Sequence, residues 1–173
     1  MNIEIRGKTK HMCKAELKFA TAFFARYLMG ERLAKNIEVE VSFLKMPGMA
    51  EGFCSPSDAE HKPRKFELLV RADMARHKTL KVLAHEMVHL KQYAKGELSN
   101  ELITAKWQGK TYKISGSLED YLNYPWEIEA FGREHGMYLV YALMLIQEKI
   151  TFKHGRVYIR GKRVSKKTLT SSK

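Results

Sequence analysis

The sequence predicts an α+β fold in one domain, with a small mixed or antiparallel sheet packed on two long helices. The chain has 173 residues, of which 45% are hydrophobic, and this is enough for a single core. Segments with the periodicity of strands or of helices follow one another as strand, helix, strands, helix, helix. This order is typical of an α+β domain. We expect the domain over residues 1–150 and a basic tail over residues 151–173.

The predicted strands lie mostly in the first half of the chain. Residues 37–43 read Ile-Glu-Val-Glu-Val-Ser-Phe, so every second side chain is apolar and one face of this strand should be buried. Residues 65–71 alternate in the same way, whereas residues 55–64 hold two of the four prolines and predict a loop. Shorter strands are expected over residues 1–6 and 51–54.

The predicted helices are bounded by recognisable end signals. Thr79 is a suitable N-cap and Gly96 a suitable C-terminal stop for the helix between them. Pro125 suits the first turn of the last helix. Helices are expected over residues 10–29, 80–95 and 125–149, and residues 97–124 should be irregular, with weak strand character over 110–114.

The net charge of +12 is unevenly distributed along the chain. Residues 151–173 contain eight Lys and Arg and no Asp or Glu. Such a block can attract nucleic acid or another polyanion through counterion release. The alternative is a solvated tail that aids solubility, because no groove-reading motif accompanies the charge.

The number of cysteines and the length of the apolar runs indicate the cellular compartment of the protein. The N-terminus lacks the apolar core of a signal peptide, and no apolar run is long enough to span a bilayer. We therefore expect a cytoplasmic protein without a membrane partner. Cys13 and Cys54 should be free thiols in that compartment, although one disulfide between them is the alternative.

One motif carries most of the chemical information. His85 and His89 are four residues apart on a predicted helix, so their side chains project from one face, one turn apart. This spacing lets two imidazoles bind one zinc ion, while Glu86 can reach a metal-activated water. The alternative is that two histidines share this spacing by chance on an ordinary core helix.

A third ligand is expected at the start of the last helix. Glu127 and Glu129 both begin a long apolar helix, where acids are costly unless they are paired or metal-bound. Glu129 shares its stripe with Arg133, whereas Glu127 has no nearby cation on its own stripe. We favour Glu127 as the ligand over Glu129. The alternative is that both acids only complement the positive end of the helix dipole.

The two motifs together resemble the zincin metallopeptidases of the gluzincin type. In that family the H-E-x-x-H helix is followed by a helix in which a glutamate, three residues before a small Ala such as Ala130, supplies the third ligand. The resemblance implies a zincin-like domain with His85, His89 and Glu127 as Zn²⁺ ligands and Glu86 as general base. The segments A-H-E-M-V-H and P-W-E-I-E-A also resemble small phage-encoded metallopeptidases.

The resemblance covers residues 51–146 and has two departures. Lys91 stands where the family usually has an apolar residue. Phe131 stands where many gluzincins have an Asp that orients a zinc-bound histidine. Glu134, Asp120 or a backbone carbonyl could take that role.

In the expected reaction, a hydrogen-bond donor should stabilise the oxyanion that forms from the substrate carbonyl. The candidates are Tyr124, His135 and Tyr138, of which Tyr138 lies on the same helix stripe as Glu127. Residues 65–71 could be the sheet edge along which a peptide substrate lies extended, and the alternative is an ordinary strand of the sheet. The leading hypothesis is a zinc-dependent metallopeptidase that hydrolyses peptide bonds. The alternatives are a nucleic-acid-associated protease like the SprT-like proteases, whose third ligand is typically His, and a non-catalytic structural protein.

Overall fold

Four strands form the central sheet, in the order β1-β2-β4-β3. The computed structural model describes residues 1–100 and 103–164. β1, β2 and β4 run parallel, and β3 pairs antiparallel with β4. The strands span Asn2–Gly7 (β1), Glu38–Leu44 (β2), Gly52–Pro56 (β3) and Lys65–Arg71 (β4). This mixed sheet, with the helices described below, confirms the predicted α+β class.

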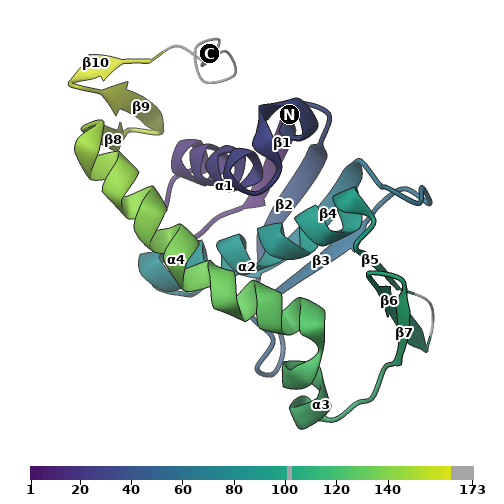
Figure 1. The fold of residues 1–173 in the computed structure, drawn as a ribbon. Coiled ribbons are helices and arrows are strands. Elements are labelled where there is room, and N and C mark those ends of the chain that lie inside the picture. Colours follow the sequence, from purple (N-terminus) through teal and green to yellow (C-terminus); the bar gives the residue numbers. More distant parts are fainter. Residues whose placement is uncertain (101–102, 165–173) are drawn as a thin grey trace.

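One face of the sheet is apolar because apolar residues alternate with polar ones along its strands. Val39, Val41 and Phe43 of β2 are buried, and so are Phe66, Leu68 and Val70 of β4. Helices α1 (Lys14–Ala34) and α2 (Arg76–Lys95) cover this face, as Figure 1 shows. The core therefore lies between the sheet and these helices.

The edge of the sheet differs from our expectation. Residues 65–71 form β4, but β4 is an interior strand, with Leu68 paired to Val41 of β2 on one side and to Cys54 of β3 on the other. The interpretation of this strand as the sheet edge was therefore wrong, and the alternative of an ordinary strand within the sheet is confirmed. The edge strands are β1 and β3, and α2 runs beneath β3.

The helix boundaries also shift. α1 continues beyond the predicted end, with a break at Gly30, whose φ of 74° and ψ of 165° are not helical. α2 begins one turn early, with Ala75 as N-cap, and the Thr79 hydroxyl donates to the carbonyl of Ala75 at 3.2 Å from inside the helix. Gly96 ends α2 in the left-handed conformation, as predicted.

Helix α4 (Pro125–Gln147) packs across α2 on the side away from the sheet (Figure 1). Its buried residues are Trp126, Glu127, Ala130, Met137 and Tyr141. The first turn of α4 thereby lies over the H-E-x-x-H segment of α2.

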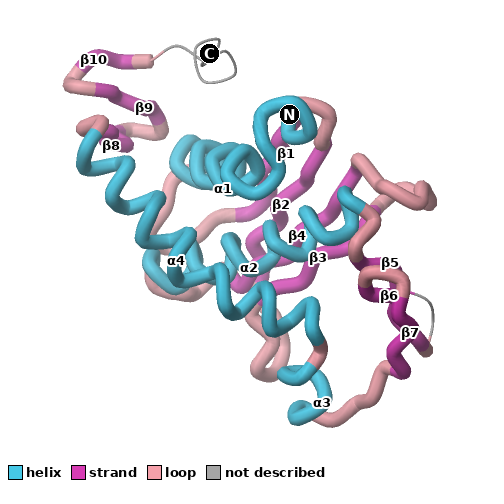
Figure 2. Tube along the Cα trace, viewed as in Figure 1, coloured by secondary structure: helices cyan, strands magenta, loops and turns pink. Residues whose placement is uncertain are grey.

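The chain between α2 and α4 forms a small lobe of its own. The described residues of the segment 97–124 form three antiparallel strands and one short helix, visible beside the main sheet in Figure 2. Trp126 joins this lobe to α4, because its ring stacks on Tyr124 with centroids 4.5 Å apart and meets the edge of Tyr112 at 5.6 Å. The strand expected over 110–114 is present as β7. The elements are β5 (Leu98–Asn100), β6 (Thr104–Trp107), β7 (Lys110–Lys113) and α3 (Leu118–Asn123).

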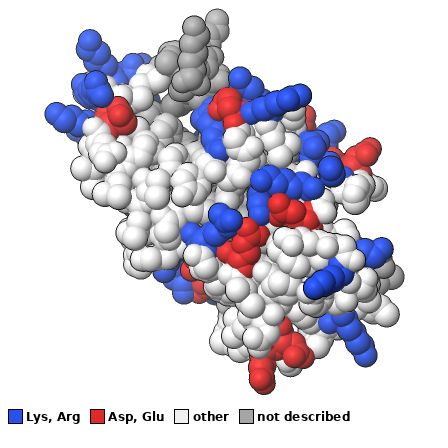
Figure 3. Space-filling model, in the orientation of Figure 1, with Lys and Arg blue, Asp and Glu red and all other residues white. Residues whose placement is uncertain are grey.

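The described part of the basic C-terminal segment is also structured. After α4 the chain forms a three-stranded antiparallel sheet of β8 (Ile150–Lys153), β9 (Arg156–Ile159) and β10 (Lys162–Arg163). Phe152 packs on Phe19 of α1, with centroids 5.7 Å apart. Figure 3 shows Lys and Arg side chains gathered around β9 and β10. The rest of the predicted tail, residues 165–173, lies outside the described residues.

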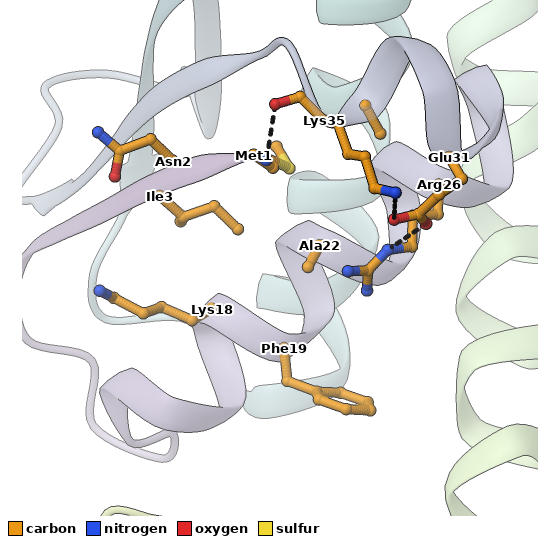
Figure 4. Close-up of a pocket in the computed structure, with 10 residues that line it drawn as sticks. Met1, Asn2, Ile3, Lys18, Phe19, Ala22, Arg26, Glu31 and Lys35 are labelled. Carbon is orange, nitrogen blue, oxygen red and sulfur yellow. Dashed lines mark hydrogen bonds and ion pairs between the residues drawn. The ribbon is translucent and has the colours of Figure 1, made fainter. Parts of the chain in front are cut away.

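A separate cavity of about 310 Å³ lies between the start of β1 and α1 (Figure 4). The amino group of Met1 donates to the carbonyl of Lys35 at 2.8 Å on one side of it. None of its lining residues comes from α2 or α4. This cavity is therefore remote from the histidine motif.

Two further observations complete the fold. Cys13 and Cys54 are both free thiols, as predicted. Within residues 1–100 and 103–164, no helix combines the length and apolarity that crossing a membrane requires.

Candidate metal centre

The two histidines of the motif lie side by side on α2. His85 and His89 are one helical turn apart and both buried, and their Nε2 atoms are 3.1 Å from each other. α2 is buried on almost every side over this stretch because the sheet lies on one face and α4 on the other. The imidazoles therefore point into the space between α2 and α4 and not toward bulk solvent.

Glu127 completes the group from the first turn of α4. Its Oε2 lies 3.3 Å from Nε2 of His85, and its Oε1 lies 3.4 Å from Nε2 of His89. The three ligand atoms lie within 4.8 Å of one another, and all three residues are buried. The His85–His89–Glu127 group can therefore hold a metal ion.

Glu129 is held elsewhere. Its carboxylate accepts hydrogen bonds from Lys91 Nζ at 2.8 Å and from Arg133 Nε at 2.8 Å. The predicted pairing with Arg133 is confirmed, and Lys91, which departs from the family pattern, is a second partner. Burial raises the pKa of Glu129, but hydrogen bonds from Lys91 and Gln92, with the charges of Lys91 and Arg133, outweigh it and hold the pKa below its usual value.

Each histidine is oriented through its other ring nitrogen. His85 Nδ1 donates to Glu134 at 3.0 Å, so Glu134 takes the orienting role that the sequence left open. His89 Nδ1 lies 2.8 Å from Oε1 of Gln92, whose amide nitrogen donates to the carbonyl of Trp126 and to Glu129. Because the amide of Gln92 is fixed in this way, Nδ1 of His89 donates to it, and Nε2 faces His85 and Glu127.

Asp120, the other acid considered for orienting a histidine, lies elsewhere. Its carboxylate accepts a hydrogen bond from the Ser115 hydroxyl, and its backbone N–H donates to the Ser117 hydroxyl. Gln92 was not predicted. Its position three residues after His89, on the same helix face, was the available signal.

The donor set fits a divalent cation. Burial alone would lower the pKa of His85, but hydrogen bonds with Glu127 and Glu134 raise it to about 9. Burial raises the pKa of Glu127, but hydrogen bonds with the two histidines lower it to about 2. Without metal, a proton on Nε2 of His85 thus lies between this nitrogen, Nε2 of His89 and the carboxylate of Glu127. Two imidazoles and one carboxylate are also the ligands of many catalytic zinc sites, and one cation would satisfy all three together.

Glu86 lies next to the three ligands without being one of them. It is buried under β3, and a Cβ atom added to Gly52 would lie only 2.3 Å from Oε1 of Glu86. Burial raises the pKa of Glu86 to about 7, against the opposing effect of His89 and His85. A carboxyl group that exchanges its proton near neutral pH is suited to general acid–base chemistry.

Two cavities flank the group. One, of about 290 Å³, is lined by His89 and Glu127, and the other, of about 470 Å³, by His85. Gly52, Phe53, Glu86 and Tyr121 line both. The centre is therefore reached from two sides, between β3 and α3.

The residues considered for the oxyanion are placed differently. Tyr138 lies further along α4 beside His135, with centroids 6.4 Å apart, and neither lines the two cavities. The Tyr124 ring lines one cavity, but its hydroxyl is bonded to Ser115 and Lys113. Tyr121 lines both cavities and hydrogen-bonds Glu127. No sequence pattern distinguished Tyr121, because its place depends on the path of α3.

Comparisons with protein-family models, with curated proteins and with solved structures find no match for this chain.

Proposed function

We propose that the protein is a zinc-dependent metallopeptidase. The observation that carries the proposal is the buried His85–His89–Glu127 group, with Glu86 beside it and a cavity on either side. Two imidazoles and a carboxylate form a borderline-soft set that suits Zn²⁺ better than Mg²⁺ or Ca²⁺. Three protein ligands leave a coordination position open, which is typical of catalytic rather than structural zinc.

The chain's own residues supply the proton transfers. When bound, zinc supplies Lewis acidity for a carbonyl group and acidifies a water molecule toward a pKa of about 7. Glu86 accepts the proton of the attacking water and delivers it to the leaving amine, which its raised pKa allows. Tyr121, on the facing wall, supplies a hydroxyl that can donate to the oxyanion once substrate displaces its bond to Glu127.

A peptide substrate suits the shape of the site. β3 is an edge strand and passes directly over Glu86, so its outer edge can pair with an extended chain. Such a chain would run from one cavity to the other between Gly52 and Tyr121. Its amide bond would then cross the space above Glu86.

The test separates metal binding from hydrolysis. Glu86→Gln should retain zinc, measured by elemental analysis, and lose about 100-fold or more of its activity on casein. Glu127→Gln should lose zinc, whereas Glu60→Gln, an exposed control, should keep both zinc and activity. Full activity in Glu86→Gln would refute the proposal. Protein purified without chelator that holds no metal would instead favour a non-catalytic role.

A second candidate function is binding of nucleic acid, favoured by the basic surface around β9 and β10 in Figure 3. Arg156, Lys162 and Arg163 are exposed there. Reversing the charge of Arg156 and Arg163 to Glu should weaken binding to duplex DNA and flatten its salt dependence. The same reversal at Lys110 and Lys113 of β7 is the matched control. Equal effects of the two double variants would show that only net charge matters.

A further inference from the structure

The cavity of about 310 Å³ between β1 and α1 takes no part in the proposed reaction. On α1, the residues Lys18, Ala22 and Arg26 follow one another at intervals of four, so they form one stripe of the helix along the cavity. The middle residue of this stripe is small. Figure 4 shows Ala22 and Ile3 of β1 on opposite sides of an open space. The hollow therefore lies where a small side chain on α1 passes the start of the edge strand β1.

The break in α1 gives the cavity its second wall. With a φ of 74° and a ψ of 165°, Gly30 interrupts the helix, and the chain resumes a helical path as far as Ala34. Glu31, Ala34 and Lys35 follow the break and line the cavity together with the stripe that precedes it. The cavity is therefore framed by both parts of α1 and by the start of β1.

The inner surface of this cavity is largely apolar. Ala34 is buried, and Ile3 and Phe19 are partly buried against the hydrophobic core. Ala22 is also partly buried. An apolar group that replaces water against such a surface gains free energy from the hydrophobic effect.

The charged side chains in the lining are unevenly matched. Among the described residues of the lining, three are Lys or Arg and one is an acid, Glu31. Oε2 of Glu31 lies 2.8 Å from Nε of Arg26, and its Oε1 lies 3.7 Å from Nζ of Lys35. Lys18 lies at the other end of the cavity from this network (Figure 4). The Lys18 end therefore favours an anion, whereas the far end already has its own carboxylate.

The volume of the cavity limits the size of its occupant. At about 30 Å³ for a group the size of a water molecule, the cavity has room for about ten non-hydrogen atoms. This is too small for a nucleotide. A wholly polar anion would leave the apolar surface uncovered, and a hydrocarbon without charge would make no use of Lys18. A short aliphatic chain that ends in a carboxylate meets both conditions.

We propose that this cavity is a binding site for a small amphipathic anion, a carboxylate with an aliphatic chain of about eight carbon atoms. We call it the amphiphile site. The carboxylate pairs with Lys18, and the chain lies against Ile3, Ala22 and Ala34. The amphiphile site shares no residue with the metal centre, so it stands or falls independently of the proposed function.

The test uses four probes on the zinc-loaded protein. Octanoate has the proposed size and charge, octanol and octylammonium keep the chain without the negative charge, and acetate keeps the carboxylate without the chain. Binding is followed by NMR titration of isotope-labelled protein, which also shows where each probe binds. Octanoate should bind with a dissociation constant of about 0.1–1 mM, a range suited to a ligand of this size. It should shift the signals of Ile3 and Ala22.

The other probes measure what each part of octanoate contributes. Octanol should bind at least about threefold more weakly, because it loses an ion pair near the surface. Octylammonium should be weaker still, since its charge repels Lys18. Acetate should be at least about tenfold weaker than octanoate, because it covers almost none of the apolar surface.

Matched variants locate the site. Ala22→Phe fills the hollow and should abolish octanoate binding, while bound zinc and the far-ultraviolet circular dichroism stay unchanged. Lys18→Glu should weaken octanoate about fivefold or more, and its effect on octanol should be small. Lys10→Glu, an exposed residue outside the lining, is the control for net charge and should change neither affinity appreciably. Because Lys18 is exposed, its variant serves as a test even where Ala22→Phe fails to fold.

Each contrary result is decisive. Absence of octanoate binding at about 10 mM would overturn the amphiphile site. Equal affinities for octanoate and octanol would overturn the role of Lys18 and with it the proposed class of ligand. Octanoate that binds the folded Ala22→Phe variant as tightly as the wild type, or that shifts only signals near the metal centre, would place its binding elsewhere.

Discussion

Glu134 accepts a hydrogen bond of 3.0 Å from Nδ1 of His85, on the opposite side of the imidazole from the ligand nitrogen. Glu134 lies two helical turns after Glu127 on α4, so one stripe of one helix provides both a ligand and the carboxylate that orients another ligand. His89 is oriented separately, by Gln92 on its own helix. The two histidines therefore depend on different partners.

These partners predict measurable changes in zinc affinity. Glu134→Leu and Gln92→Leu should each weaken zinc binding by about 10–100-fold, because each removes the hydrogen bond that holds one imidazole in its ligand tautomer. Competition against a zinc chelator measures the affinity, with Glu60→Gln as the exposed control. Unchanged affinity in both variants would mean that packing alone orients the rings.

The closeness of β3 to Glu86 gives a second prediction. Gly52→Ala should displace Glu86, because the new Cβ would lie 2.3 Å from Oε1 of Glu86 and 2.8 Å from a methyl group of Val82. Activity should fall more than tenfold while bound zinc is retained, since Gly52 touches no ligand atom of the metal group. Gly116→Ala is the matched control, as its Cβ would meet nothing within 4 Å. Loss of zinc in Gly52→Ala would show that the substitution disrupts the fold and does not act on Glu86 alone.

Stability should depend on pH differently with and without metal. The folded state raises the pKa of His85 from 6.5 to about 9, so its protonated form stabilises the fold below pH 6.5 and this stabilisation disappears by about pH 9. Glu86 acts in the same direction, because its raised pKa of about 7 makes its ionisation destabilising. Chelated protein should lose stability on the order of 2 kcal/mol between pH 6 and pH 9.

Urea unfolding at the two pH values, with zinc or with chelator, measures this difference. In zinc-loaded protein the imidazoles are unprotonated throughout, so the loss should be clearly smaller. Equal losses in both forms would show that His85 is not the group responsible.

Two glycines in the middle of α4 should be replaceable with a gain. Gly132 and Gly136 are exposed, and a Cβ at either would meet nothing within 4 Å. Each change to Ala should raise the free energy of unfolding by about 0.5–1 kcal/mol, because glycine is a poor helix former. Thermal unfolding measures the effect. A loss of stability would indicate that this face of the helix is covered in solution.

The site was more predictable from the sequence than its surroundings were. Helical periodicity alone places His85 and His89 together, and the choice of Glu127 over Glu129 followed from which acid shared a stripe with Arg133. The position of Tyr121 at the site could not be predicted in this way, because no periodicity relates Tyr121 to α2 or α4. The interior position of residues 65–71 was also missed, since alternation shows which face of a strand is buried and not which strand lies beside it.

The two three-stranded sheets, β5–β7 and β8–β10, have a sequence signal in their turns. Three of their hairpins turn through two residues with positive φ, which matches type I′ turns: Gln108-Gly109, His154-Gly155 and Arg160-Gly161. The first residue of each pair is a poor former of such turns, so the pattern is weaker than Asn-Gly. The high positive charge of the last segment also favoured the interpretation as a tail.

Several contacts among the described residues hold the lobe of residues 97–124 to α2 and α4. Lys91 pairs with Glu97 at its start and with Glu129 just past its end, and Gln92 donates to the carbonyl of Trp126. The three residues of the metal group lie on α2 and α4, but Tyr121 of the lobe hydrogen-bonds the ligand Glu127 and lines both cavities. The lobe is therefore coupled to the metal centre through one hydroxyl group. A lobe exchanged for another sequence would have to keep a hydrogen-bond donor at this position to leave the carboxylate of Glu127 as it is.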